Sequence, residues 1–138
     1  MNVSQIMTSR VVTVEMDDRL QAVKEIFDHV HFHHLLVVEG GTLRGVISDR
    51  DLLRVVSPNL GTIRESLKDT AALNKRVHQI MSRDPVTLPP EASVREAIEV
   101  FNTHRISCIP IVSAEGRPVG LLSWRDILKA LVSEPFAL

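Results

Sequence analysis

The sequence predicts an α+β fold, a mixed α/β protein in which two β-α-β-β-α repeats pack through their sheets with pseudo-twofold symmetry. Three observations predict it. Nearly all of the chain is written twice, each copy passes from helical hydrophobic spacing to short apolar runs, and 138 residues suit one compact domain or two small halves that share a core.

The repeat is visible by eye. "VSQIM" begins at Val3 and "VHQIM" begins at Val77, 74 residues later. The same offset aligns "VVTV" with "PVTL", "LQAVKEIF" with "VREAIEVF", and "LLVV" with "IPIV". After one extra residue, "GVISDRDLL" from Gly45 aligns with "GLLSWRDIL" from Gly120. We therefore predict a first repeat over 1–56, a connecting segment over 57–76, a second repeat over 77–132 and a tail over 133–138.

The elements of each repeat follow from its pattern. A turn at Ile-Met comes first, and an extended piece follows at 12–13 in one copy and 86–87 in the other. Apolar residues at helical spacing then predict an amphipathic helix, with Leu20, Val23, Ile26, Phe27 and Val30 in the first repeat and Val94, Ala97, Ile98 and Phe101 in the second. Buried strands are expected at 35–38 and 109–112, and after a glycine turn at 46–47 and 121–122. The final helices are predicted over 49–56 and 124–132.

The connecting segment contains Pro58 and Gly61, which suit a loop. Thr62-x-x-Glu65 has the pattern of a capping box, so a helix is predicted to open there.

Both repeats end in the same motif: glycine, two aliphatic residues, serine, two residues and aspartate. One interpretation is a helix N-cap, in which Ser48 or Ser123 accepts from free backbone N–H groups and the acid favours the positive helix end. The other is a ligand site. A helix N-terminus attracts phosphate, an aspartate can accept hydrogen bonds from a ribose diol, and Arg50 or Arg125 could neutralise phosphate. The motif alone leaves both open, and the arginines are equally consistent with surface ion pairs.

Composition restricts the classes of function. A net charge of −1 makes nucleic-acid binding unlikely. Cys108 is the single cysteine, which excludes an internal disulfide and suggests a reducing compartment. No apolar run approaches the roughly 20 residues that span a bilayer, and the first residues lack a secretory core. We expect a cytoplasmic protein. Without a glycine-rich phosphate loop or a metal-ligand motif, we do not expect an enzyme or a resident cofactor.

The repeat and its motif together resemble a tandem pair of cystathionine β-synthase (CBS) domains, a Bateman module. The segments "TV…LQAVKEIF…HLLVV…GVISDRDLL" and "VTL…VREAIEVF…ISCIPIV…GLLSWRDIL" carry the resemblance over almost the whole chain. It implies a regulatory sensor that binds AMP, ADP, ATP or S-adenosylmethionine in clefts between the repeats. It also implies a disc-like homodimer built through the last helices, an allosteric response, and a regulated partner outside this chain.

The resemblance further implies that each cleft combines both repeats. One cleft would contain Ser48, Arg50, Asp51, Pro85, Val86, Ser107, Cys108, Ile109 and Pro110, and the other Ser123, Arg125, Asp126, Val11, Val12, His33, His34 and Leu35. The aliphatic residues would sandwich adenine and the aspartates would hold the ribose. Trp124 replaces Asp49 at the mouth of the second cleft, and Ser107 and Cys108 stand where the first repeat has His33 and His34, so the clefts should differ in anion preference.

The run "HVHFHH" raises the question of a metal site. Its four histidines cross a predicted helix-to-strand corner, so they should point in different directions and no obvious ligand set completes them. His29 and His31 should finish the helix, where charged histidine favours the dipole. His33 or His34 could instead contact a phosphate, and affinity would then weaken as pH rises through about 6.5.

Two other functions stay open at this stage. The chain could be a purely structural dimerisation module with empty clefts, or, less plausibly, a binder of nucleic acid or metal. Ligand-dependent thermal stability would separate the first from a sensor, because a ligand that binds the native state must stabilise it.

Overall fold

A computed structural model describes residues 1–56, 61–64 and 66–134 of the chain. The predicted features at Pro58 and Glu65, and residues 135–138 of the predicted tail, lie outside the described residues. The fold is a mixture of strands and helices, which confirms the predicted α+β class. It divides into two compact units, which we describe separately. The first-repeat unit comprises Val12–Gly40 and Arg44–Asp84, and the second-repeat unit comprises Met1–Val11, Gly41–Leu43 and Pro85–Leu138.

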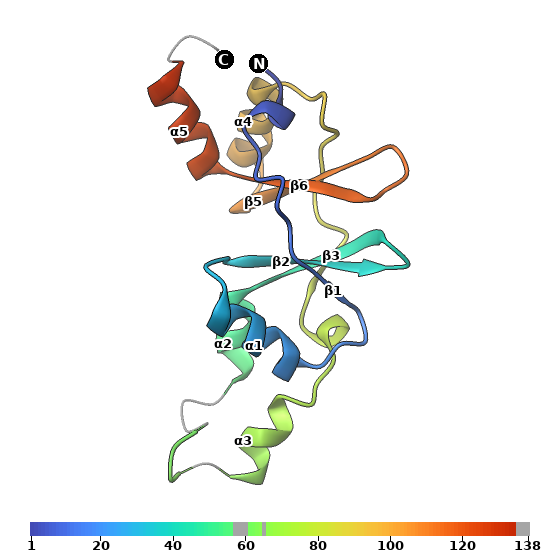
Figure 1. The fold of residues 1–138 in the computed structure, drawn as a ribbon, viewed down its shortest axis with the longest axis vertical. Coiled ribbons are helices and arrows are strands. Elements are labelled where there is room, and N and C mark those ends of the chain that lie inside the picture. The colour runs from blue at the N-terminus through green and yellow to red at the C-terminus, as the bar shows by residue number, and fades with distance from the viewer. Residues whose placement is uncertain (57–60, 65, 135–138) are drawn as a thin grey trace. The chain divides into compact units, whose positions relative to one another are not determined.

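The first-repeat unit is built on a sheet of order β1-β2-β3-β4. Its strands are β1 (Thr13–Glu15), β2 (His34–Glu39), β3 (Thr42–Ser48) and β4 (Ser82–Arg83). β1 runs parallel to β2, and β4 runs antiparallel to β3. The helices are α1 (Leu20–His29), α2 (Asp49–Val55) and α3 (Leu67–Ala72), and η2 (Val77–Gln79) is a 3-10 turn. α1 and α2 lie next to each other beside this sheet (Figure 1).

The core of this unit follows the predicted periodicities. α1 contributes Leu20 and Val23 from one face, because residues three apart share a side of a helix. β2 contributes Leu35 and Val37, and β3 contributes Ile47. All four residues 35–38 are buried, as expected for a strand covered on both faces.

The second-repeat unit contains η1 (Val3–Gln5), α4 (Val94–Thr103), β5 (Cys108–Val112), β6 (Pro118–Ser123) and α5 (Trp124–Ser133). β5 and β6 form an antiparallel pair with Ile109 opposite Leu122. α4 and α5 pack with this hairpin (Figure 1), and Val94, Ala97, Ile109, Ile111, Leu122 and Ile127 are among the buried core residues.

The extended piece predicted at 86–87 is shorter than its copy. In the first repeat, β1 pairs over three residues, whereas the second repeat has one isolated parallel bridge between Leu88 and Ile111. Pro89 and Pro90 follow Leu88 directly. Proline has no N–H to donate, so the ladder cannot extend past Leu88 as it extends to Glu15.

The helix of the connecting segment begins later than predicted. α3 starts at Leu67, and its N-cap is Ser66, whose hydroxyl accepts from the backbone N–H of Asp69 at 3.4 Å. The hydroxyl of Thr62 instead accepts from the N–H of Arg64 at 3.2 Å, two residues ahead. Our placement of the helix start at Thr62 is therefore wrong, because threonine also favours local turns of this kind.

Each unit takes its leading 3-10 turn from the other repeat. Val3 is fully buried in the core of the second-repeat unit, and Val77 is fully buried in the core of the first-repeat unit. Backbone bonds fasten both turns: Val3 N donates to Ala92 O at 2.8 Å, and Val77 N donates to Asp18 O at 2.8 Å. The repeats seen in the sequence therefore differ from the compact units of the structure.

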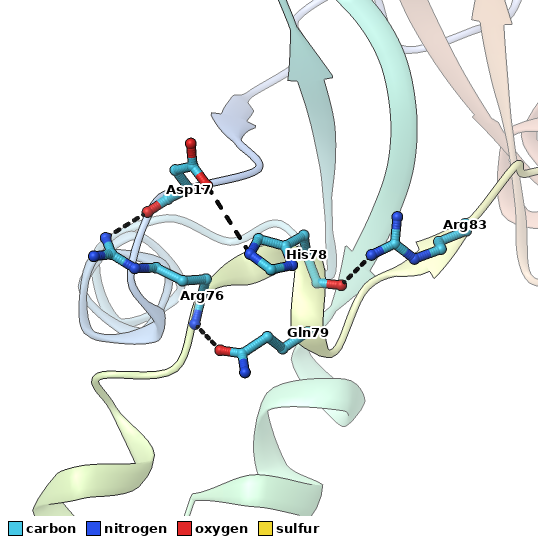
Figure 2. A network of polar contacts seen from close by, with 5 residues as sticks. All are labelled: Asp17, Arg76, His78, Gln79 and Arg83. Atoms are coloured by element: carbon cyan, nitrogen blue, oxygen red, sulfur yellow. Dashed lines mark hydrogen bonds and ion pairs between the residues drawn. The ribbon is translucent and has the colours of Figure 1, made fainter.

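Side chains reinforce η2 in the first-repeat unit (Figure 2). Arg76 Nη1 donates to the carbonyl oxygen of Asp17 at 2.8 Å, and the Asp17 carboxylate lies 3.9 Å from His78 Nε2. Arg83 Nη2 donates to the carbonyl oxygen of His78 at 2.9 Å. These contacts are exposed, so their contribution to stability is small beside the burial of Val77.

Candidate functional site

The Gly-x-x-Ser-x-x-Asp motif of the first repeat spans the junction of β3 and α2. Asp51 N donates to Ser48 Oγ at 3.1 Å, and Ser48 N donates to Asp51 Oδ2 at 2.8 Å. The motif is therefore a complete capping box, as the cap interpretation predicts. The Asp51 side chain is 20% exposed, and Arg54 Nη1 lies 3.9 Å from its other oxygen, Oδ1.

The second repeat builds the same box between β6 and α5. Asp126 N donates to Ser123 Oγ at 3.3 Å, and Ser123 N donates to Asp126 Oδ2 at 2.9 Å. Trp124 follows the serine and is 49% exposed. The Arg125 guanidinium lies 5.9 Å from the centroid of its ring, so this arginine is partly engaged by a cation–π contact.

A third capping box shows that the cap is not itself a binding signature. Ser66 and Asp69 at α3 make the same reciprocal contacts, with Ser66 N donating to Asp69 Oδ2 at 2.9 Å. No Gly-aliphatic-aliphatic strand precedes this box in the sequence. The two repeat motifs therefore differ from this box in the strand, β3 or β6, that contains the motif glycine and ends at the serine. The serine–aspartate pair is common to all three.

Each motif glycine accommodates a methionine from an exchanged turn. A Cβ added to Gly45 would lie 2.8 Å from Met81 Sδ, and one added to Gly120 would meet Met7 Sδ even more closely. In each unit, the methionine of the leading turn therefore packs against the motif glycine: Met81 against Gly45, and Met7 against Gly120. The sequence showed both as repeated features but carried no signal that they touch.

The histidines of the first repeat lie beside the first cap. His33 directly precedes β2, and its carbonyl oxygen accepts from Asp49 N at 3.0 Å. Its Nδ1 lies 2.9 Å from Asp49 Oδ2. Sequence reasoning missed this hydrogen-bonding contact, because the two residues are brought together only by the pairing of β2 with β3.

His34 is half-buried at the start of β2. Burial lowers the pKa of His34 below its ordinary value of 6.5, and His33 and Arg50 lower it further, while Asp49 and Asp51 oppose the shift. His34 is therefore neutral at physiological pH.

The remaining predicted site residues divide between the units. Val12 belongs to the first-repeat unit, where its carbonyl oxygen accepts from Leu36 N at 3.1 Å, and Leu35 is buried beside it. The second-repeat unit contains Val11, Pro85, Val86, Ser107, Ile109 and Pro110. Cys108 is opposite Ser123 in the ladder, so Ser107 lies near the second cap. The structure thus places His33 beside the cap of the first-repeat unit and Ser107 near the cap of the second-repeat unit. That each ligand site combines the cap of one repeat with residues of the other stays a prediction.

The other sequence candidates have plain structural positions. His29 ends α1, and its Nδ1 lies 2.7 Å from the carbonyl oxygen of Glu25, while exposed His31 follows the helix C-cap. Burial raises the pKa of Cys108 to about 12, so its thiol is protonated at neutral pH. Within residues 1–56, 61–64 and 66–134, no group of three His, Cys, Asp or Glu side chains could hold a metal ion. None of the helices described is long and apolar enough to span a bilayer.

Comparison with known sequences identifies both repeats. The sequence model of the CBS domain matches residues 3–58 and 77–133. A CBS domain-containing protein of Dictyostelium discoideum is 31% identical over 132 residues, which cover 94% of this chain and 90% of that protein. Other relatives are longer. The chain spans 47% of protein MJ1225 of Methanocaldococcus jannaschii, at 28% identity, and 23% of an inosine-5'-monophosphate dehydrogenase of Korarchaeum cryptofilum, at 27% identity.

Solved structures share the fold. The crystal structure of MJ1225 superposes with a TM-score of 0.82 at 27% identity, covering 97% of this chain and 51% of that one. CBSX2 of Arabidopsis thaliana in complex with AMP has a TM-score of 0.79 at 22% identity, with 96% of each chain covered. The CBS domain pair of MJ0100, in complex with 5'-methylthioadenosine and S-adenosylmethionine, has a TM-score of 0.76 at 21% identity, covering 95% of this chain and 99% of that one.

Proposed function

Because the chain belongs to the CBS domain family, as a tandem pair of these domains, we propose that it is a regulatory module that binds adenosyl ligands and responds by a conformational change. The ligand classes are AMP, ADP, ATP and S-adenosylmethionine. Two proteins of the same fold support this choice, because CBSX2 is bound to AMP and the MJ0100 pair to S-adenosylmethionine and 5'-methylthioadenosine.

The observation that carries the proposal is that, in both repeats, the serine–aspartate cap directly follows a glycine-containing strand, β3 or β6, which the capping box of α3 does not. In both caps the backbone N–H of the serine engages Oδ2, so the second oxygen, Oδ1, can accept hydrogen bonds from a ribose diol. Both carboxylates are half-buried, which strengthens their hydrogen bonds relative to those of a fully exposed group. Asp51 and Asp126 are therefore our proposed ribose ligands.

The remaining roles rest on the family resemblance. We propose that each ligand is held by residues of both repeats, with Pro85, Val86, Ile109 and Pro110 on one adenine and Val11, Val12 and Leu35 on the other. Ser48 and Ser123 would contact the ligand through hydroxyl groups that also cap the helices. We also include Arg50, Arg125 and Ser107 among the residues that line the two sites.

A regulatory role also requires something to regulate. We propose that these residues regulate an activity rather than catalyse a reaction, because the two CBS matches account for most of the 138 residues. A ligand changes the balance between two conformations only if it binds one of them more tightly. The proposed response is therefore a shift between arrangements of the module, coupled to the occupied site.

We further propose a homodimer formed through the last helices of each repeat. On α5, Trp124, Leu128 and Val132 are 49%, 51% and 85% exposed and lie four residues apart, so they form one apolar stripe. On α2, Leu53 is 72% exposed at the position that aligns with Leu128. Light scattering should report a dimer, and Leu128→Asp should convert it to a monomer. A monomeric wild type would refute the dimer.

Calorimetry tests the binding proposal. Each of the four ligands is titrated into the wild type and into Asp51→Asn and Asp126→Asn. We expect at least one ligand to bind, and each substitution to weaken one binding event by about tenfold, because asparagine lacks the charge that strengthens the ribose hydrogen bonds.

Asp69→Asn is the matched control, since it makes the same change in the capping box of α3. It should leave ligand affinity unchanged. If none of the four ligands binds the folded wild-type protein, or raises its thermal midpoint at millimolar concentration, the chain is instead a structural dimerisation module.

A further inference from the structure

The first-repeat unit has a cavity at the corner between α1 and β2. Its volume is about 240 Å³, and it is lined by Phe27, Val30, His31, Phe32, His33 and Asp49. Sites that enclose whole drug-sized ligands are typically larger, about 300–1,000 Å³. The cavity is therefore suited to one functional group of a ligand rather than to an entire nucleoside.

Asp49 determines which nitrogen of His33 carries the proton. His33 Nδ1 lies 2.9 Å from Asp49 Oδ2, and an ionised carboxylate can only accept a hydrogen bond. Nδ1 must therefore be the donor. In the neutral ring the other nitrogen, Nε2, then holds a lone pair and acts as an acceptor. Because the His33 side chain is 74% exposed, a ligand can reach this nitrogen.

The charge of the lining also favours a donor. With histidine counted as neutral, the six lining residues have a formal charge of −1, which comes from Asp49. The Asp49 side chain is 39% exposed. Neighbouring groups do not reverse this sign. His34 is neutral because burial lowers its pKa, and Arg50 and Asp51 carry opposite charges. Phe27 and Phe32 contribute aromatic rings, whose faces attract cations.

We propose that this cavity binds a cationic, hydrogen-bond-donating group, such as an ammonium, and so makes the first repeat selective for an adenosyl ligand with a cationic tail over one with phosphates. The inference rests on the proposed adenosyl-binding function and deepens it. A phosphate, which offers acceptor oxygens, would face the Nε2 lone pair and the Asp49 carboxylate. It would gain a donor there only when His33 is protonated.

The second repeat lacks this arrangement. Ser107 and Trp124 align with His33 and Asp49, so the second repeat has no imidazole–carboxylate pair at these two positions. The selectivity should therefore belong to one of the two ligand sites. Two sites of different charge would allow one module to respond to two adenosyl ligands.

A comparison of S-adenosylmethionine with 5'-methylthioadenosine tests the proposal. Both contain the thioadenosyl group, and S-adenosylmethionine adds a sulfonium charge and an aminocarboxypropyl group whose ammonium and carboxylate leave the ligand with a net positive charge. At pH 7.5 we expect calorimetry to show about tenfold tighter binding of S-adenosylmethionine at one site. Asp49→Asn should reduce this preference to about threefold or less and leave the affinity for 5'-methylthioadenosine unchanged, which also shows that the variant is folded.

Asp28→Asn is the matched control. Asp28 is an exposed carboxylate of α1 in the same unit, paired with Lys24, so its loss changes the net charge equally without altering the cavity. It should retain the tenfold preference.

The outcomes separate the two proposals. Equal affinities for the two ligands, or a preference unchanged in Asp49→Asn, would overturn the cation site while adenosyl binding stands. Binding of neither these ligands nor any nucleotide would overturn the proposed function and the cation site with it. Tighter binding of ATP than of S-adenosylmethionine at pH 7.5 at the site that Asp49→Asn affects would also contradict the assigned charge preference.

Discussion

The two motif glycines allow a quantitative test of how the exchanged turns pack. A methyl group at Gly45 would lie 2.7 Å from the backbone oxygen of Ser82 and 2.8 Å from Met81 Sδ. Ser82 belongs to β4, which is paired with β3 at this point, so its oxygen cannot retreat without disturbing the ladder. At Gly120 the three nearest atoms all belong to the Met7 side chain, which is flexible and can change rotamer.

The two substitutions should therefore differ in cost. Overpacking a core typically destabilises a protein by about 1–3 kcal/mol. We expect Gly45→Ala to fall near the upper end, at about 3 kcal/mol, and Gly120→Ala near the lower end, at about 1 kcal/mol. For a chain of this size, each kcal/mol lowers the midpoint of thermal unfolding by roughly 3 °C, so the two variants should differ by roughly 6 °C.

Urea unfolding of single and double variants measures the source of each cost. Met7→Ala should relieve most of the strain in Gly120→Ala, giving a favourable coupling energy of about 1 kcal/mol. Met81→Ala should relieve less of the strain in Gly45→Ala, because the Ser82 oxygen remains in place. Equal costs for the two glycine substitutions, with equal relief by the two methionine substitutions, would refute the role assigned to the β4 backbone.

Three further predictions concern the core, the half-buried histidine and the second cap. Val77→Ala should cost about 1.5–3 kcal/mol and lower hydrogen-exchange protection in β2 and β3; loss confined to β5 and β6 would contradict the exchanged turn. Burial lowers the pKa of His34, so the unfolded chain takes up a proton first as pH falls. Stability should be full above pH 6.5 and decline below it, and His34→Gln should flatten that decline in urea titrations; identical profiles would be inconsistent with this. Ser123→Ala removes the acceptor for Asp126 N and should cost about 1 kcal/mol by thermal unfolding, whereas no loss would mean that the cap is dispensable.

Local features were predictable wherever a residue acts on its own neighbours in the chain. The periodicity of 20–30 predicted α1 because helix faces repeat every three to four residues, and the serine–aspartate spacing predicted both caps because a cap closes within one turn. The start of α3 was misplaced because Thr62 and Ser66 both have cap chemistry. The choice between them depends on the fold around them rather than on either residue.

The candidate site was predictable in part for the same reason. Ser48, Asp51, Ser123 and Asp126 stand out because the motif recurs. The His33–Asp49 pair does not, because residues sixteen positions apart meet only when β2 and β3 align. A single histidine and a single aspartate carry no pattern that would join them.

The sequence by itself determined that the protein is a tandem repeat, that each copy has the same succession of helices and strands, and that it resembles the CBS family. These properties follow from local propensity and from self-similarity, which are written directly in the order of residues. Only the tertiary structure decided which copy each leading turn belongs to. Val3 is buried in the core of the second-repeat unit and Val77 in the core of the first-repeat unit. An apolar turn of a few residues has no core of its own, so it packs against the unit in which a motif glycine leaves room for its methionine.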